Sequence, residues 1–271
     1  MNAIRIMIMA ALCAGLALGG IWLFNEVDDL EVTRLAVISG ANRGAGVRIA
    51  QISDLHMTGA RPVENRALQA LIREDPDLVA ITGDIFPHQR PQAMLEKYLR
   101  QLPRRARKFA VPGNWDYLDG RNVPAMRSFY AALGVTLLVN EAVMVEGRFL
   151  VVGLDDLLLG QPDWHKAIDR HRDWQGPLLI LAHNPQTVTL LPRVNPLWKY
   201  ALMLAGHTHG GQVVIFGNSL KPYGFDNSVC FSGWCPDELV RMYVSRGVGS
   251  TILPLRIGAR PELPVIEWIP S

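Results

Sequence analysis

Five apolar runs, each ending in polar or glycine residues, constrain the fold of this chain more than any other feature. They read VRIAQISDLH, DLVAITGD, KFAVPGNWD, PLLILAHNP and YALMLAGHTHGG. Short apolar runs with turn residues at one end are typical of buried strands. Residues 63–75 and 91–102 lie between the first three runs and carry apolar side chains on one helical face. Strands that alternate with helices predict a parallel sheet with helices packed outside it.

The rest of the chain predicts a second sheet. Residues 140–153, NEAVMVEGRFLVVG, favour a hairpin of two short strands that turns at Glu146 and Gly147. Residues 239–269 have the turn-rich pattern of antiparallel strands. With 271 residues, the chain has ample material for a large core. We therefore expect an α/β domain in which two sheets lie face to face with helices outside them, as four layers.

The N-terminal segment predicts a membrane anchor. Residues 6–24 contain no charged side chain, and this run is long enough to cross a bilayer as a helix. A cleavable signal peptide is the alternative, since Ala17-Leu18-Gly19 offers a small-x-small cleavage site, although the apolar run continues past it. The expected division of the chain is a single-pass anchor at 1–25, a linker and first strand region at 26–46, and the folded domain at 47–271.

Charge and cysteine content narrow the range of partners. A net charge of +2 at pH 7 indicates no nucleic-acid partner. Arg5 precedes the predicted anchor while Arg34 and Arg43 follow it, so the distribution of positive charge leaves open which side of a membrane the domain occupies. Cys230 and Cys235 bracket FSGW and could form a disulfide in an oxidising compartment or remain thiols.

Metal-binding side chains end all five strand-like runs. Ligands gather beyond the carboxyl ends of the strands in a parallel sheet. His207 and His209 are one residue apart, so both imidazoles can face one point, although a solvated loop is the alternative for this pair alone. Imidazole and carboxylate together suit zinc, iron or manganese better than calcium, and a large ligand set predicts two ions that share a carboxylate. The candidate residues are Asp54, His56, Asp84, Asn114, His183, His207 and His209.

The same motifs carry a family resemblance. SDLH, GD, GNWD, AHNP and GHTHGGQ, in this order, resemble the motifs of the calcineurin-like metallophosphoesterases across about residues 47–270. The segment VSRGVGSTILPLRIGARPEL is similar to the membrane-anchored branch related to bacterial UDP-2,3-diacylglucosamine hydrolases. The resemblance implies a four-layer α-β-β-α sandwich and a hydrolase of phosphoric ester or anhydride bonds. With the predicted anchor, it also implies a location in a bacterial inner membrane.

The resemblance further implies a role for each candidate residue. Two divalent ions, with manganese favoured and zinc or iron as alternatives, would ready a hydroxide for attack on phosphorus. The first ion would be held by Asp54, His56, Asp84 and His209. The second would be held by Asp84, Asn114, His183 and His207, with Asp84 as the bridge. The residues closest to the chemistry would be Asp54, Asp84, Asn114 and His207.

One residue departs from the family pattern. Much of the family has GNHD where this chain has GNWD, so Trp115 replaces a histidine that is thought to assist the leaving group. An indole donates one hydrogen bond but cannot shuttle a proton. Proton transfer to the leaving group contributes about 10²–10⁴ in rate, and it matters least when the leaving group is already stable as an anion. We therefore expect a preference for a pyrophosphate linkage or another activated phosphodiester.

Three functional hypotheses follow, two of which are enzymes with different substrates and one of which has no catalytic activity. The first is a phosphorylated lipid, UDP-2,3-diacylglucosamine in lipid A synthesis, reached from a membrane through the N-terminal helix. The second is an extracytoplasmic phosphodiesterase or phosphatase that acts on soluble small molecules. The third, prompted by Trp115, is a catalytically silent metal-binding scaffold. The sequence leaves the oligomeric state open.

Overall fold

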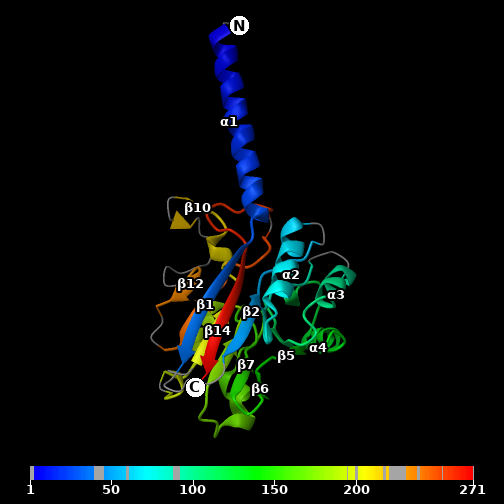
Figure 1. Cartoon of the computed structure of the whole chain (residues 1–271), viewed down its shortest axis with the longest axis vertical. Helices are drawn as coiled ribbons and strands as arrows, with labels where there is room; N and C mark the ends of the chain where they lie inside the picture. Colours follow the sequence, from blue (N-terminus) through cyan, green and yellow to red (C-terminus); the bar gives the residue numbers. More distant parts are fainter. Residues whose placement is uncertain are drawn as a thin grey trace.

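The computed structural model describes residues 3–39, 46–58, 61–87, 92–193, 195–198, 201–215, 218–219, 230–236, 239–251 and 253–270. Within these ranges the fold contains two large sheets, a short two-stranded ribbon and helices on the outside (Figure 1). The ribbon pairs β10 (Val214–Ile215) with β11 (Asn218–Ser219). The mixed α/β fold with two sheets therefore agrees with the expectation from the strand and helix patterns.

The first sheet has the strand order β1-β14-β2-β3-β4-β5. Its central strands β2 (Val47–Ile52), β3 (Leu78–Thr82) and β4 (Arg107–Val111) are parallel, and β5 (Thr136–Leu137) extends them. β14 (Glu262–Pro270) pairs with β2 in antiparallel fashion and with β1 (Glu31–Ser39) in parallel. The N-terminal and C-terminal strands thus close one side of this sheet together.

The second sheet has the order β12-β13-β9-β8-β7-β6. Its parallel centre consists of β7 (Phe149–Gly153), β8 (Leu178–Leu181), β9 (Ala201–Ala205) and β13 (Arg241–Val244). Antiparallel strands flank it, β6 (Glu141–Val145) beside β7 and β12 (Gly233–Cys235) beside β13. The predicted hairpin is confirmed, because β6 and β7 turn at Glu146 and Gly147, both with positive φ. The tail is only partly antiparallel, since β13 runs parallel to β9.

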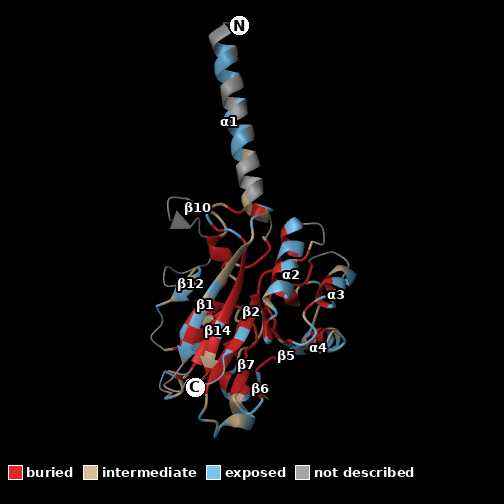
Figure 2. Cartoon of the chain, viewed as in Figure 1, coloured by how far each residue is buried: buried red, intermediate tan, exposed pale blue. Residues whose placement is uncertain are grey.

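Side chains that alternate along the strands form three buried apolar layers. One lies between the two sheets, and each of the other two lies between a sheet and the helices outside it. Ile49 and Ala80 face the other sheet, whereas their neighbours Ala50 and Val79 face the helices, as the period of two in a strand requires. The helices over the first sheet are α2 (Pro62–Glu74), α3 (Ala93–Leu99) and α4 (Val123–Ala131). α5 (Trp164–Ile168) and the 3-10 helix η3 (Pro185–Leu190) pack on the outer side of the second sheet. A short 3-10 helix, η2 (Asp169–His171), follows α5 and has no buried residue. Figure 2 shows the resulting buried strands between more exposed helices.

The N-terminal segment forms the long helix α1 (Ala3–Asp28), which projects away from the sheets (Figure 1). A membrane span needs about twenty consecutive apolar residues. Among the residues that the structure describes, no helix meets the length and apolarity that a span requires. The predicted N-terminal transmembrane helix is therefore wrong, and so is the single-pass location in a bacterial inner membrane that depended on it.

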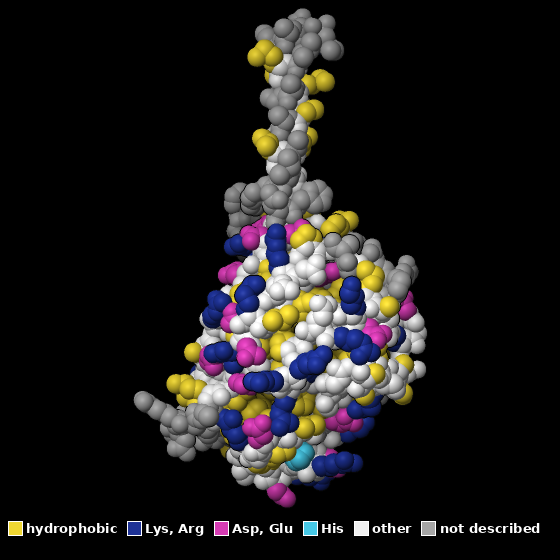
Figure 3. Space-filling view, turned by 45° about the vertical axis from the view of Figure 1, so that its right-hand side comes forward, with side chains coloured by type: hydrophobic (Ala, Val, Ile, Leu, Met, Phe, Trp, Pro, Cys, Tyr) yellow, Lys and Arg dark blue, Asp and Glu magenta, His cyan; other side chains and the backbone are white. Residues whose placement is uncertain are grey.

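The surface of the folded part carries mixed charges. On the face shown in Figure 3, Lys and Arg side chains are interspersed with Asp and Glu side chains. Exposed ion pairs in the described part of the chain include Arg48 with Glu267 and Arg127 with Glu141. Exposed pairs of this kind contribute little to stability, about 0–1 kcal/mol each.

Candidate metal centre

The ends of five strands from both sheets deliver the predicted site residues. A hydrogen bond links the ends of the two sheets here, because the backbone N–H of His207 donates to the side-chain oxygen Asp54 Oδ1 at 3.0 Å. In both sheets these are C-terminal strand ends, where an α/β fold places its ligands. Asp54 and His56 follow β2, and Asp84 follows β3. Asn114 follows β4, and His183 follows β8. His207 and His209 follow β9.

The first cluster, which we call the Asp54 group, consists of Asp54, His56 and His209. His209 Nε2 lies 3.2 Å from His56 Nε2 and 3.4 Å from Asp54 Oδ1. The two imidazole rings stack with centroids 5.1 Å apart. Ser53 Oγ donates to Asp54 Oδ2 at 2.6 Å and helps to fix the carboxylate. One ligand atom from each member lies within 4.8 Å of the others, so the group could hold a metal ion.

The second cluster, the Asp84 group, consists of Asp84, His183 and His207. His183 Nε2 lies 3.2 Å from Asp84 Oδ2 and 3.1 Å from His207 Nδ1. His183 Nδ1 donates to the carbonyl of Thr82 at 2.8 Å, which directs Nε2 towards the other two members. Such a bond from the second ring nitrogen is usual for a metal-binding histidine. One ligand atom from each member of this group also lies within 4.8 Å of the others, so the group could hold a second ion.

Asp84 connects the two groups. Its Oδ2, which lies near His183, is also 3.7 Å from His56 Nε2 in the Asp54 group. Its Oδ1 accepts the backbone N–H of Trp115 at 2.8 Å, so the carboxylate is held from both ends. One oxygen of this buried residue therefore faces both clusters.

Asn114 provides a test of whether the site fits a cation. Its Oδ1 is buried and has no hydrogen-bond partner in the described part of the chain. The residue directly precedes the 3-10 helix η1 (Trp115–Tyr117), whose first N–H binds Asp84. An amide oxygen that loses water without gaining a partner costs about 1–3 kcal/mol. Imidazoles together with carboxylate and amide oxygens are the donors that a divalent metal ion requires. The two groups and the unpartnered oxygen of Asn114 therefore fit the two ions that the resemblance implies.

The backbone at the site is held in an uncommon conformation. Asp54, His56, Asp84, His207 and His209 have φ values of 50°, 39°, 53°, 71° and 51°, in the left-handed region that side chains other than glycine rarely adopt. Such conformations cost roughly 1–3 kcal/mol each and persist where the surrounding structure enforces them. This concentration of strain in both groups is typical of a functional site.

Glycine is required at two close approaches beside these residues. A Cβ at Gly206 would lie 1.9 Å from Ser53 Oγ and 2.4 Å from Asp54 Oδ2. A Cβ at Gly113 would lie 2.2 Å from Asp84 Oδ1. The glycines of the GN and GH motifs therefore let the backbone reach the carboxylates.

Protonation in the metal-free site follows from burial and from the carboxylates. Burial alone would lower the pKa of His183, but the carboxylates of Asp84, Asp54 and Asp156 together outweigh burial and raise that pKa to about 10. Burial would also raise the pKa of Asp84, yet His183 brings it below its ordinary value. Burial lowers the pKa of His56 to about 4 and that of His207 to about 3, and it also lowers the pKa of His209 well below its ordinary value. Three imidazoles are therefore neutral at pH 7, with lone pairs available to a cation.

Asp116, the last residue of the GNWD motif, is fully buried. Its buried carboxylate accepts backbone N–H bonds of 2.8–3.1 Å from Gly113, Asp84, Ile85 and Phe86. Burial, with a smaller effect from Asp84, raises its pKa to about 7. Asp116 therefore stabilises the backbone of the turn that carries Asp84.

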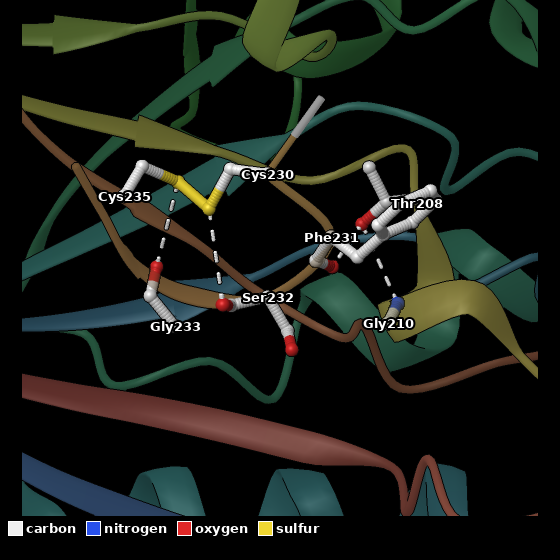
Figure 4. The surroundings of a disulfide bond; sticks show 7 residues. All are labelled: Thr208, Gly210, Cys230, Phe231, Ser232, Gly233 and Cys235. Carbon is white, nitrogen blue, oxygen red and sulfur yellow. Dashed lines mark hydrogen bonds between the residues drawn. A yellow bond between two sulfur atoms is a disulfide. The ribbon is translucent and has the colours of Figure 1, made fainter. Parts of the chain in front are cut away.

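A disulfide lies next to the His207–His209 loop. Cys230 and Cys235 are bonded to each other, so of the two alternatives the structure has the disulfide (Figure 4). Thr208 Oγ1, between the two histidines in sequence, donates to the carbonyl of Phe231 at 2.6 Å. The loop that the disulfide closes therefore supports the backbone that carries His207 and His209.

A two-sheet α/β fold with adjacent histidine and aspartate groups at its strand ends defines a metallohydrolase of the dinuclear class. Residues 47–215 match the family described as Calcineurin-like phosphoesterase. The uncharacterized metallophosphoesterase YkuE of Bacillus subtilis is 32% identical over 233 residues, which cover 81% of this chain and 78% of that protein. Phosphodiesterase YaeI of Escherichia coli is 30% identical over 257 residues, 91% of each chain. The chain therefore belongs to the calcineurin-like phosphoesterase family and is a hydrolase that acts on phosphoric esters.

Proposed function

We propose that this protein is a phosphodiesterase whose active site is the pair of metal-binding groups joined by Asp84. The observation that carries the proposal is the position of Asp84 Oδ2, 3.2 Å from His183 Nε2 and 3.7 Å from His56 Nε2. One carboxylate oxygen that faces both groups supports a shared, bridging ligand. The name of the relative YaeI supports a diester as the substrate.

In this proposal the chain's residues act by holding and orienting. Asp54, His56, Asp84 and His209 would hold one ion. Asp84, Asn114, His183 and His207 would hold the other. When bound, two such ions supply Lewis acidity, which acidifies water and offsets negative charge on phosphoryl oxygens. Manganese is the metal we propose, with zinc and iron as alternatives that the same ligands accept.

The leaving group is constrained by Trp115. Its ring meets the His56 ring edge-on, with centroids 5.1 Å apart and planes at 79°, at the rim of the Asp54 group. An indole cannot transfer a proton, so the departing oxygen receives no proton from this position. This favours substrates whose leaving group is stable as an anion: aryl phosphodiesters and nucleotide-sugar pyrophosphates, with UDP-2,3-diacylglucosamine as the most specific candidate.

The test of the function is metal-dependent turnover of an aryl phosphodiester, with manganese, zinc or iron supplied separately. We expect Asn114→Ala to lower kcat by about 100-fold, because even residues that only support a metal ligand cost 10–100-fold in affinity or activity. Asn122→Ala is the matched control, since Asn122 caps α4 away from the site. Wild-type protein that does not hydrolyse the aryl phosphodiester with manganese, zinc or iron would refute the proposal.

The role of Trp115 predicts a change in substrate preference. We expect Trp115→His to raise turnover of alkyl phosphodiesters by about 10²-fold or more, because it introduces a group that can protonate a poor leaving group. Turnover of an aryl diester should change by much less. The measurement is the ratio of kcat/KM for the two esters in wild type and variant, and an unchanged ratio would contradict the leaving-group argument.

A further inference from the structure

A cavity of about 670 Å³ lies at the end of the first sheet that is remote from the metal centre. It is lined by the end of α3, the segment that leads into β4, the end of α4, and residues of β5 and β6. Arg107 and Lys108 begin β4 and line the cavity, whereas Asn114 of the metal centre follows the other end of that strand. Small molecules bind in cavities of about 300–1,000 Å³. The cavity therefore has the size of a small-molecule site and is separate from the metal centre.

Positive charge lines this cavity, which we call the Arg104 cavity. Its charged lining residues are Arg100, Arg104, Arg107 and Lys108, three of them from the basic run RRARK. No Asp or Glu in the described part of the chain lines it. A neighbouring cavity, in contrast, mixes cations with carboxylates such as that of Glu141. A concave surface with charge of one sign concentrates ions of the opposite sign, so the Arg104 cavity favours an anion.

Much of the remaining lining of the Arg104 cavity is apolar. Leu99, Leu102 and Phe109 belong to it and are buried, so the chain offers an uncharged surface alongside the cations. A Cβ added at Gly134, which also lines the cavity, would meet no atom within 4 Å, so there is open space beside this residue. A ligand that matches this lining has an anionic group together with an apolar substituent.

The arginines of the cavity differ in their partners. Arg100 Nη2 lies 2.6 Å from Glu96 Oε1, and Arg107 Nη2 lies 3.1 Å from Glu146 Oε1. Both pairs are exposed, and exposed pairs are weak enough for a ligand to compete with them. Arg104 is exposed and has no ion pair in the described part of the chain. Its guanidinium is therefore available to a ligand.

Lys108 is the cation that most needs an anion. It is partly buried, and burial lowers the pKa of its ammonium group. Its Nζ donates to the Ala106 carbonyl at 2.9 Å, which uses one of three N–H groups. Within the residues that the structure describes, no carboxylate forms an ion pair with it. A charge that has lost water is stabilised by a counter-charge, so an anion in the cavity would supply what the chain does not.

Helix ends explain only part of this positive charge. The C-terminal ends of α3 and α4, with C-caps Arg100 and Ala132, both line the cavity. Positive side chains stabilise such ends, but the effect falls off within the last turn. Arg100 is placed for that role, whereas Arg104 and Lys108 lie outside both helices. A different role is needed for Arg104 and Lys108.

We propose that the Arg104 cavity binds a phosphate monoester that carries an apolar substituent. Such a phosphate has about −1.5 to −2 charge at pH 7 and three oxygens that accept strong hydrogen bonds. A phosphodiester carries a single negative charge and matches two cations less well. Arg104 and Lys108 bind the phosphate, and the apolar lining packs on the substituent. Neither metal-binding group takes part, so this site goes beyond the proposed function and does not depend on it.

The first test is calorimetric titration of the full chain with phenyl phosphate in the presence of a chelator, which keeps metal ions from binding the ligand. We expect one phenyl phosphate to bind per chain. Arg104→Gln and Lys108→Gln should each weaken binding about tenfold, because each removes a hydrogen bond between charged groups. Arg73→Gln is the matched control, because Arg73 is exposed in the last turn of α2 and does not line the cavity.

Three results of this titration would count against the proposal. Wild-type protein that binds no phenyl phosphate at millimolar concentration would overturn it. Equal affinity in Arg104→Gln, Lys108→Gln and Arg73→Gln would also overturn it. Diphenyl phosphate, which has one charge, should bind the wild type more weakly, and equal affinity for the two ligands would overturn the preference for a monoester.

The second test locates the ligand in the wild type without any variant. On titration with phenyl phosphate under the same conditions, the backbone amide NMR signals of Gly134 and Thr136, which line the cavity, should shift. Shifts confined to the residues of the metal centre would overturn the proposal, even if a variant fails to fold. Neither test measures hydrolysis, so failure of the proposed function would appear in the turnover of the aryl phosphodiester and would leave both results unchanged.

Discussion

Asp84→Asn is expected to reduce phosphodiester hydrolysis by about 10³-fold. The substitution keeps the size of the side chain but replaces a charged oxygen that faces both metal-binding groups with a neutral amide. Ions that stabilise a phosphoryl transition state contribute several kcal/mol, and each 1.36 kcal/mol is a factor of ten in rate. The fold should tolerate the change, because asparagine is among the few residues that adopt a positive φ, here 53°. The measurement is kcat together with the number of ions bound per chain.

The control for this variant is Asp75→Asn. Asp75 also has positive φ, 43°, but lies exposed at the C-terminal cap of α2, away from both groups. The activity of the Asp75→Asn protein should match that of the wild type. Asp84→Asn protein that binds two ions and retains activity within about tenfold of the wild type would show that Asp84 does not bridge them.

Much of the site was predictable because it depends on local pattern. Each predicted residue comes directly after a short apolar run, and the residues after a strand lie at the C-terminal edge of its sheet. The sequence could therefore predict that His183 and His207 would lie close together, which the structure shows at 3.1 Å. The hairpin at Glu146 was predictable for the same reason, since its turn and its two strands are adjacent in sequence.

The features that were missed depend on contacts between distant segments. The buried Arg256, whose Nη2 lies 3.2 Å from His209 Nδ1, is 47 residues away from that histidine in sequence, and no spacing rule connects the two. The parallel pairing of β13 with β9 is also non-local, and turn-rich composition does not reveal it. The N-terminal segment is a different case, because an uncharged run in the sequence is not by itself sufficient evidence for a membrane span.

Metal removal is expected to abolish hydrolysis and to lower the thermal stability of the protein. A ligand that binds only the folded state stabilises it by about 2.7 kcal/mol when its concentration is 100 times Kd. Two such ions would contribute about 5 kcal/mol, and each kcal/mol shifts Tm by about 2–4 °C in a protein of 150–250 residues. We therefore expect a chelator to lower Tm by about 10–20 °C, measured by calorimetry, and manganese to restore both Tm and activity.

The physical reason for this loss lies in the metal-free centre itself. Burial raises the pKa of Asp54 to about 6, so at pH 7 the protein holds an ionised carboxylate that has lost most of its hydration. The buried Asn114 oxygen has no partner in the described part of the chain, and five site residues are held at positive φ. These three features lower the stability of the folded protein, and cations that bind these groups offset that loss. Asp84→Asn should respond more weakly to the chelator than the wild type, because it has less metal to lose. A wild-type Tm that is the same with chelator and with manganese would contradict this account of how the centre is stabilised.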